Sequence, residues 1–314
     1  MKRLFARRRS REPGWLAISR QAGGLSFAHG VCAAGAKGAI RRFGTLATDP
    51  EAKDLERFAN DLEVGRYQCL TLLPAADYQL LMVEAPNVPA PELKNAVRWR
   101  IKDMIDYHVE DATVDVLDIP PDAARGGRNH SMYAVAARNE IIQRCIEQFG
   151  AAKIPLTVID IAETAQRNIA ALFEQPERGL AFLYVGAEHA LLTINFRGEL
   201  YLARRIDVTV DELAKLARGG SQDMANRVLL ELQRSFDHLD RQHPFVSLSK
   251  LVLGPEPEDT GLAAHLAANL GLPVEQARLA DVIDFAPDAA LSPDDAWRLF
   301  HVLGAALRNE TKTL

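Results

Sequence analysis

The chain has 314 residues and 48% of them are hydrophobic, so it is long enough to bury a large core in one two-lobed unit or in two domains. Its 37 Lys and Arg residues stand against 42 Asp and Glu, a formal net charge of -5. Six cations lie within the first eleven residues, so the rest of the chain holds 31 bases and 42 acids, a balance of about -11 that argues against a nucleic-acid-binding surface.

The cations at the start form a tail that we place at residues 1–13. A solvated tail is the simpler interpretation, and peripheral contact of residues 1–12 with an anionic membrane is the alternative. The run from Arg7 to Glu12 interrupts any apolar core of a secretory signal, and no stretch approaches the roughly 18 apolar residues of a spanning helix. We therefore expect a cytoplasmic protein. The cations of the tail are Lys2, Arg3, Arg7, Arg8, Arg9 and Arg11.

Apolar residues alternate or recur at helical spacing throughout the first half, which predicts strands and helices in turn. Residues 21–24 are expected to turn the first strand into the second, and Asp49 to cap the first helix. The polar segment 122–129 is expected to be a loop. The predicted strands cover 14–19, 25–31, 40–47, 69–73, 78–84, 114–119 and 131–137, and the predicted helices cover 49–63, 91–107 and 139–151.

The second half continues this pattern. Turns at Gly186 and Gly198 are expected to join three successive strands into a meander. Because strands and helices occur in alternating groups in both halves, we expect an α/β protein with two lobes. The predicted strands cover 156–161, 180–185, 190–196, 200–206 and 248–253, with an edge strand from Val274, and the predicted helices extend from about 161 to 173 and cover 210–217, 222–239, 260–270 and 293–308.

Common catalytic and metal-binding motifs are missing from the sequence. It contains no GxxxxGK[ST] phosphate loop, no GxGxxG after a strand, no HExxH or CxxC pair and no GxSxG elbow. The three cysteines are far apart, which fits buried thiols in a reducing compartment. We therefore predict no catalytic residue and no metal site.

Five segments follow one another along the chain, namely Val97 to Ile119, Ala134 to Phe173, Gly179 to Ile206, Leu253 to Glu275 and His301 to Asn309. Their sequences and their order resemble those of PilM-type type IV pilus assembly proteins of the MshI kind. The resemblance covers residues 14–309, and it implies a two-lobed actin-like (ASKHA, ribonuclease H-like) α/β fold with a small inserted subdomain. Its lobes would be residues 14–175, with the insertion near 84–138, and residues 176–314.

The resemblance also shows where this chain departs from active actin-like ATPases. In those enzymes two Asp-x-Gly hairpins wrap the phosphates, and their carboxylates position Mg²⁺ and water. The matching hairpins here read Ala17-Ile18-Ser19-Arg20 and Leu183-Tyr184-Val185-Gly186, without an acid. The adenosine loop continues from Gly254 into Pro255-Glu256-Pro257, and Asp160 is the one matching carboxylate.

These departures predict a degenerate nucleotide cleft. The resemblance places Ser19, Asp160, Gly186 and Gly254 in it. A helix cap at Asp160 and simple turn geometry at the two glycines are the ordinary alternatives. We expect no cofactor, with weak binding of ATP and Mg²⁺ as the alternative.

The resemblance further implies a protein partner, the N-terminal cytoplasmic segment of a bitopic inner-membrane pilus assembly protein of the PilN/MshJ kind. Candidate contacts are Arg98, Trp99, Arg100 and Tyr107, because Trp, Tyr and Arg dominate many interfaces. A core helix with cationic flanks is the alternative. The expected function is a non-catalytic scaffold of MSHA-type pilus biogenesis, peripheral to the inner membrane. An actin-like ATPase and the cytoplasmic domain of a type II secretion platform protein are the competing hypotheses.

Overall fold

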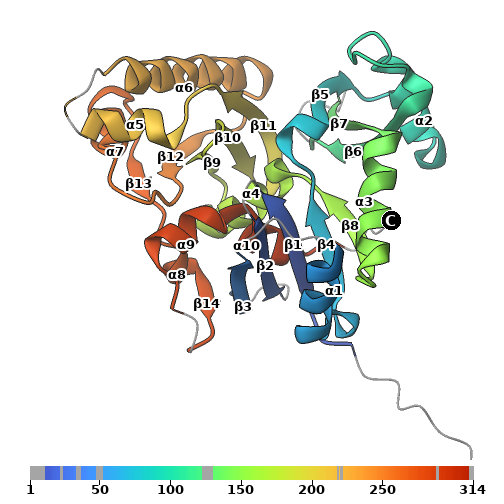
Figure 1. Ribbon diagram of the computed structural model, residues 1–314. Helices are drawn as coiled ribbons and strands as arrows, with labels where there is room; N and C mark the ends of the chain where they lie inside the picture. Colours follow the sequence, from blue (N-terminus) through green and yellow to red (C-terminus); the bar gives the residue numbers. More distant parts are fainter. Residues whose placement is uncertain are drawn as a thin grey trace, which may run out of the picture.

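Two lobes and a small extra subdomain make up the molecule (Figure 1). The predicted tail up to residue 10, the turn residues 22–23, the expected cap Asp49 and the loop 122–129 lie outside the described residues. The computed structural model describes residues 11–21, 24–32, 37–46, 52–121, 130–217, 219, 222–287 and 290–310.

The first lobe is built on a six-stranded sheet in the order β14-β3-β2-β1-β4-β8. β1, β2 and β3 form an antiparallel meander, whereas β4 and β8 run parallel to β1. β14 comes from near the end of the chain and adds parallel to β3. The strands are β1 (Trp15–Gln21), β2 (Gly24–Val31), β3 (Gly38–Leu46), β4 (Gln68–Leu72), β8 (Leu156–Asp160) and β14 (Ile283–Phe285).

Helices cover both faces of this sheet. Leu16 and Ile18 of β1 belong to a core with Phe58 and Phe149 from two of the helices, whereas Ala17 belongs to a second core with the other two. This division follows from the alternation of side chains along a strand. The helices of the first face are α1 (Ala52–Asp61) and α3 (Asn139–Ala151), and those of the second are α4 (Ala162–Ala170) and α10 (Phe300–Ala306).

The second lobe contains a five-stranded sheet in the order β11-β10-β9-β12-β13. Its strand β9 is apolar along its whole length because both of its faces are buried. Phe182 packs with Phe300 of α10, while Leu183 packs in the core beneath α6. The elements are β9 (Gly179–Val185), β10 (Ala190–Phe196), β11 (Glu199–Ile206), β12 (Leu248–Leu253), β13 (Val274–Gln276), α5 (Val210–Ala217), α6 (Asp223–Gln242), α7 (Leu262–Asn269), α8 (Leu279–Val282) and α9 (Pro293–Arg298).

The small subdomain lies between β4 and α3 in the chain. Its three antiparallel strands run in the order β5-β7-β6, and one helix buries Val97 and Ile101 against them. The Tyr133 hydroxyl donates to the carbonyl of Tyr201 at 3.3 Å, which ties the subdomain to β11 of the second lobe. The elements are β5 (Tyr78–Glu84), α2 (Ala90–Arg100), β6 (Ala112–Asp118) and β7 (Ser131–Arg138), and short 3-10 turns occupy Val64–Arg66, Ala75–Asp77, Val109–Asp111 and Ala171–Phe173.

Most predicted strands and helices are confirmed within a few residues, but four details were wrong. The helix expected at 91–107 ends at Arg100. Continuing it would place the acidic Asp103 and Asp106 in its last turn, where the helix dipole disfavours negative charge. The helix expected at 293–308 breaks at Leu299 into α9 and α10. The four-residue helix α8 and the three-residue strand β14 were both missed, because such short segments carry no periodic signal.

Candidate functional site

The residues predicted for the nucleotide cleft lie at the ends of strands. Ser19 lies near the end of β1 and Asp160 ends β8, and the parallel register of β1, β4 and β8 brings both to one edge of the first sheet. Gly186 follows β9 and Gly254 follows β12 in the second sheet, where the Gly254 N–H donates to the Leu183 carbonyl at 2.7 Å. The carboxyl ends of parallel strands are the usual ligand-binding edge of α/β sheets.

The Asp160 carboxylate is engaged by the protein itself. One oxygen accepts a hydrogen bond from the Arg308 guanidinium at 2.8 Å, and the side chains of the two residues are only 6% and 7% exposed. The other oxygen accepts from the Ile161 N–H at 2.9 Å and from the Thr164 hydroxyl. The cap residue of α4 is Ile161, so helix capping does not account for Asp160. A carboxylate committed to a buried ion pair is a poor Mg²⁺ ligand.

Tyr184 stands where the resemblance expects an aspartate, and its side chain is buried. Its ring stacks on Phe300 at 4.7 Å between centroids and 7° between planes, and its hydroxyl donates to the Trp297 carbonyl at 2.9 Å. The Trp297 indole in turn donates to the Val185 carbonyl at 2.8 Å. Burial raises the pKa of Tyr184 well above its usual value. This residue therefore ties β9 to α9 and α10 and presents no charge to a metal ion.

The loop after β12 is held by contacts with β9 and β13 and by one hydrogen bond of its own. A β-carbon at Gly254 would lie 3.1 Å from a ring atom of Tyr184, so the close packing of that ring explains the glycine. The Gly254 carbonyl accepts from the Gln276 amide at 2.6 Å. The Glu256 carboxylate accepts from the Thr260 hydroxyl at 2.9 Å, and burial raises the pKa of Glu256.

A cluster of charged and polar groups joins the two lobes, and reasoning from the sequence missed it. Arg205 of β11 pairs with Glu163 of α4 at 3.0 Å and donates to the Ala75 carbonyl at 2.6 Å. Its guanidinium also lies 4.7 Å from the ring centroid of Tyr78, whose hydroxyl donates to the Glu163 carboxylate. Glu163 is almost fully buried. We name Tyr78, Glu163 and Arg205 the interlobe latch, since they connect β11 of the second lobe to α4 of the first lobe and to β5 of the small subdomain.

Comparison with solved structures decides the fold. A chain of the PilM-PilN type IV pilus biogenesis complex superposes with a TM-score of 0.68 at 20% identity, over 94% of this chain and 96% of that one. A Bacteroides thetaiotaomicron protein described as having an actin-like ATPase fold and unknown function gives 0.50 at 11% identity, over 86% and 92%. The chain has the actin-like fold. The predicted fold class, and the likeness to PilM at the level of the fold, are confirmed.

The cytoplasmic domain of EpsL, an inner membrane component of the type II secretion system of Vibrio cholerae, gives a TM-score of 0.49 at 14% identity, over 95% of this chain and 96% of that domain. No protein-family model and no curated protein sequence matches the chain.

The two side chains at the strand ends where a nucleotide site was predicted contact other parts of the protein. Asp160 is paired with Arg308, and Tyr184 packs on Phe300. Within the residues that the structure describes, no three His, Cys, Asp or Glu side chains are grouped to hold a metal ion. In the same residues, no helix is both long and apolar enough to cross a bilayer.

His301 of α10 lies beside the Tyr184 ring, and we expect it to make stability depend on pH. Its side chain is half-buried, and desolvation lowers its pKa to about 3. The unfolded chain therefore takes up this proton first, near the ordinary pKa of 6.5, and stability is lost as pH falls below that value. Between pH 7.5 and pH 5 we expect this residue to remove about 2 kcal/mol from the free energy of unfolding.

Urea titrations at the two pH values measure this effect. His301→Gln should show a pH dependence shallower by that amount, whereas the matched control His108→Gln, at an exposed position, should keep the wild-type dependence. Equal slopes for wild type and His301→Gln would contradict the assignment.

The residues predicted to contact a partner are spread over the inserted subdomain. Trp99 is 53% exposed on the side of α2 opposite the buried Val97. A guanidinium nitrogen of Arg100 lies 3.6 Å from a carboxylate oxygen of Glu84. The Arg138 guanidinium lies 4.3 Å from the ring centroid of Tyr107. Arg98 and Tyr107 are half-buried, so Trp99 and Arg100 are the most accessible of the four.

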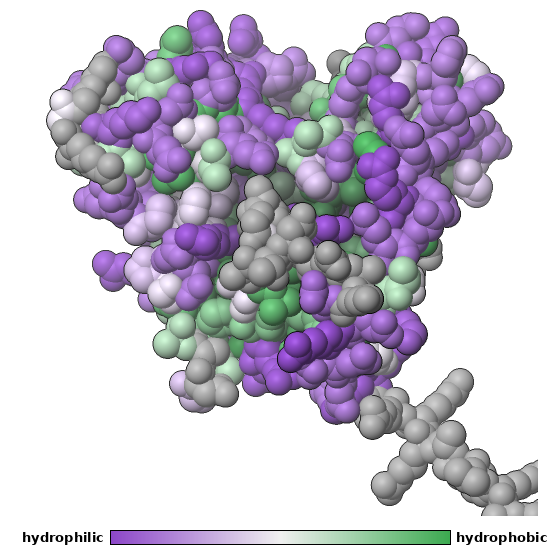
Figure 2. All heavy atoms as spheres, viewed as in Figure 1, coloured by the Kyte–Doolittle hydropathy of each residue, from purple (hydrophilic) through white to green (hydrophobic). Residues whose placement is uncertain are grey.

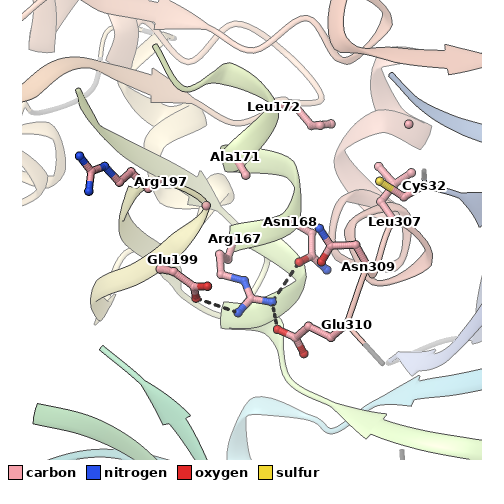
Figure 3. Close-up of a pocket in the computed structure, with 12 residues that line it drawn as sticks. Cys32, Arg167, Asn168, Ala171, Leu172, Arg197, Glu199, Leu307, Asn309 and Glu310 are labelled. Atoms are coloured by element: carbon pink, nitrogen blue, oxygen red, sulfur yellow. Dashed lines mark hydrogen bonds and ion pairs between the residues drawn. The ribbon is translucent and has the colours of Figure 1, made fainter. Parts of the chain in front are cut away.

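A cavity of about 220 Å³ lies at the other end of α4 (Figure 3). Figure 3 shows the Arg167 guanidinium between the carboxylates of Glu199 and Glu310. Glu310 also pairs with Arg308 at 2.9 Å, which in turn pairs with Asp160. The ion pairs of Arg167 at this cavity are therefore connected through Glu310 and Arg308 to Asp160.

Proposed function

We propose that this chain is a non-catalytic cytoplasmic scaffold of type IV pilus biogenesis, of the MSHA type and peripheral to the inner membrane. The observation that carries the proposal is the ion pair between Asp160 and Arg308, because it engages the carboxylate that the resemblance matches to a metal-binding position while the actin-like fold is kept. The stacking of Tyr184 on Phe300 supports it further, since it fills the second phosphate hairpin with a neutral aromatic ring.

The partner in this proposal is the N-terminal cytoplasmic segment of a bitopic inner-membrane protein of the PilN/MshJ kind. PilM is found with PilN in the solved complex, and this chain has the PilM-like fold. Trp99 and Arg100 supply an exposed aromatic and a cation on α2, the kinds of side chain that dominate binding energy at interfaces. Arg98 and Tyr107 complete the proposed contact surface from half-buried positions.

Calorimetric titration of the full chain with a synthetic peptide covering the partner segment tests this surface. We expect Trp99→Ala to weaken binding by at least about tenfold, because a central interface aromatic commonly contributes that much. Leu230→Ala is the matched control, since Leu230 is 45% exposed on α6 of the second lobe. Equal peptide affinities for the wild type and Trp99→Ala would contradict the proposed contact.

Mg-ATP titration in the same calorimeter tests the absence of catalysis. The expected result is no saturable heat and no phosphate release. Micromolar binding with turnover would instead support an actin-like ATPase, and Ser19, Gly186 and Gly254 would then be the residues to examine around the nucleotide.

A further inference from the structure

The inserted subdomain buries both faces of its three-stranded sheet. Side chains alternate along β7, so Met132, Ala134 and Ala136 lie in the core beneath α2. Tyr133 and Ala137 lie on the opposite face, where Tyr133 belongs to the core of the second lobe and Ala137 to a core with residues of the first lobe. An antiparallel sheet can leave one face in water, so burial of the second face indicates that the subdomain packs onto both lobes.

Two leucines on this second face contact both lobes. Leu80 of β5 and Leu117 of β6 pack against the core of the second lobe. They also pack against a smaller core that contains Leu73 and Ile161 of the first lobe. A change in the angle between the lobes would therefore separate these side chains from one of the two cores and expose apolar surface to water.

Tyr133 covers the edge of the sheet in the second lobe. β11 is the outermost strand of that sheet among the described residues. The Tyr133 hydroxyl accepts a hydrogen bond from the Ala203 N–H at 3.1 Å and donates to the Tyr201 carbonyl at 3.3 Å. An edge strand offers such backbone groups to a further strand, and here a phenol takes that place. Tyr133 is buried, so both backbone groups would lose this partner if the subdomain moved away.

The interlobe latch lies two residues further along β11. Arg205 pairs with Glu163 of the first lobe at 3.0 Å, and the Tyr78 hydroxyl of β5 donates to the same carboxylate. Glu163 is only 2% exposed, so separating it from Arg205 would leave a buried carboxylate without its cation. The apolar packing, the covered strand edge and the ion pair therefore all resist the same movement of the lobes.

We propose that the inserted subdomain and the interlobe latch form a brace, which holds the two lobes in one arrangement through contacts of this chain alone. The three strands of the subdomain lie between β11 and α2 (Figure 1). Because α2 packs on the other face of the same sheet, the brace also fixes the exposed Trp99 relative to the second lobe. The brace depends on these contacts and not on a role in pilus biogenesis. Its residues are Tyr78, Leu80, Leu117, Tyr133, Glu163 and Arg205.

The outer surface shows where movement of the lobes would occur. Figure 2 shows a notch between the second lobe and the inserted subdomain, with hydrophobic side chains along it. Without the brace, rotation of one lobe against the other would widen or narrow this notch. A rigid-body rotation of about 15°, as in known subunit movements, would shift the far ends of the lobes by several ångströms.

Pulsed electron paramagnetic resonance on the full-length chain tests the brace with one spin label in each lobe. The labels are attached through noncanonical amino acids at the exposed positions Asn60 of α1 and Leu230 of α6, so the three native cysteines stay in place. The wild type should give one narrow distance. The brace variant combines Glu163→Gln, Arg205→Gln and Leu117→Ser, and it neutralises the latch pair together so that no single charge is left buried. It should give a broader distribution or a second maximum shifted by several ångströms.

The control variant makes matching changes within the second lobe. Glu177→Gln with Arg197→Gln neutralises an exposed ion pair, and Leu270→Ser shortens a leucine that is half-buried against the core of that lobe. Its distance distribution should equal that of the wild type. Urea titration checks that each variant keeps a cooperative unfolding transition. If the brace variant does not, Tyr133→Phe takes its place, because it keeps the buried ring and removes only the hydroxyl.

Three outcomes would overturn the brace. They are a broad or two-peaked distribution in the wild type, a distribution in the brace variant (or in Tyr133→Phe in its place) as narrow as that of the wild type, and equal broadening in the control variant. The peptide titration described for Trp99 measures affinity and not the distance between the lobes, so its failure is distinguishable from failure here.

Discussion

Replacing Gly304 with alanine should lower the free energy of unfolding by about 3 kcal/mol, at the upper end of the range for overpacked cores. Gly304 lies in α10 where this helix crosses α4, and a β-carbon there would lie 2.2 Å from the Ala165 carbonyl oxygen. That oxygen belongs to the backbone of a buried helix, so it cannot turn aside as a flexible side chain would. The hydrogen bond from Asn168 to the Gly304 carbonyl, 3.0 Å long, would be strained as well.

Urea-induced unfolding of the full chain measures this effect, and a second glycine provides the control. Gly150 lies in α3, and a β-carbon added there would meet no atom from outside its own helix within 4 Å. Gly150→Ala should therefore be neutral or stabilising by up to about 1 kcal/mol, because alanine is the better helix former. A Gly304→Ala variant as stable as the wild type would refute the close crossing of α4 and α10.

Local signals in the sequence were enough for most of the fold. The apolar run of β9, the turn glycines Gly186 and Gly198, and the helical spacing in α6 each depend on near neighbours in the chain, and the corresponding elements are present. The ends of the helices were harder to predict from the sequence. The end of α2 and the break at Leu299 depend on charge near a helix terminus and on tertiary packing, which a short window of sequence does not contain.

Only part of the candidate site could be predicted from the sequence. The missing acids at Ser19 and Tyr184 could be read directly, since a substitution is visible in the sequence itself. The cations that pair with the two carboxylates could not be predicted, because Arg308 is 148 positions from Asp160 and Arg205 is 42 positions from Glu163. The one available signal was a buried-looking stretch around residues 156–170 that nevertheless contains Asp160 and Glu163, since charged residues in such a run need partners.

The ion pair at the centre of the proposed scaffold should also be among its strongest single contacts. Arg308→Met should lower the free energy of unfolding by about 3 to 5 kcal/mol, because it leaves the Asp160 carboxylate buried without its cation. Asp160→Asn should cost less, since Arg308 keeps its ion pair with Glu310 at 2.9 Å. The double variant should cost less than the sum of the two single variants, because the two side chains interact directly.

Denaturant titrations of these three variants and the wild type form a complete cycle, and added Mg²⁺ distinguishes a structural aspartate from a metal ligand. If the role of Asp160 is its ion pair with Arg308, millimolar Mg²⁺ should leave the unfolding midpoint of the wild type unchanged. A midpoint that Mg-ATP raises in the wild type and not in Asp160→Asn would mean that the carboxylate leaves Arg308 for a metal, since a ligand stabilises only the state that binds it. In that case the chain would have a working nucleotide site. The proposal of a non-catalytic scaffold would then be wrong, because it depends on the ion pair between Asp160 and Arg308.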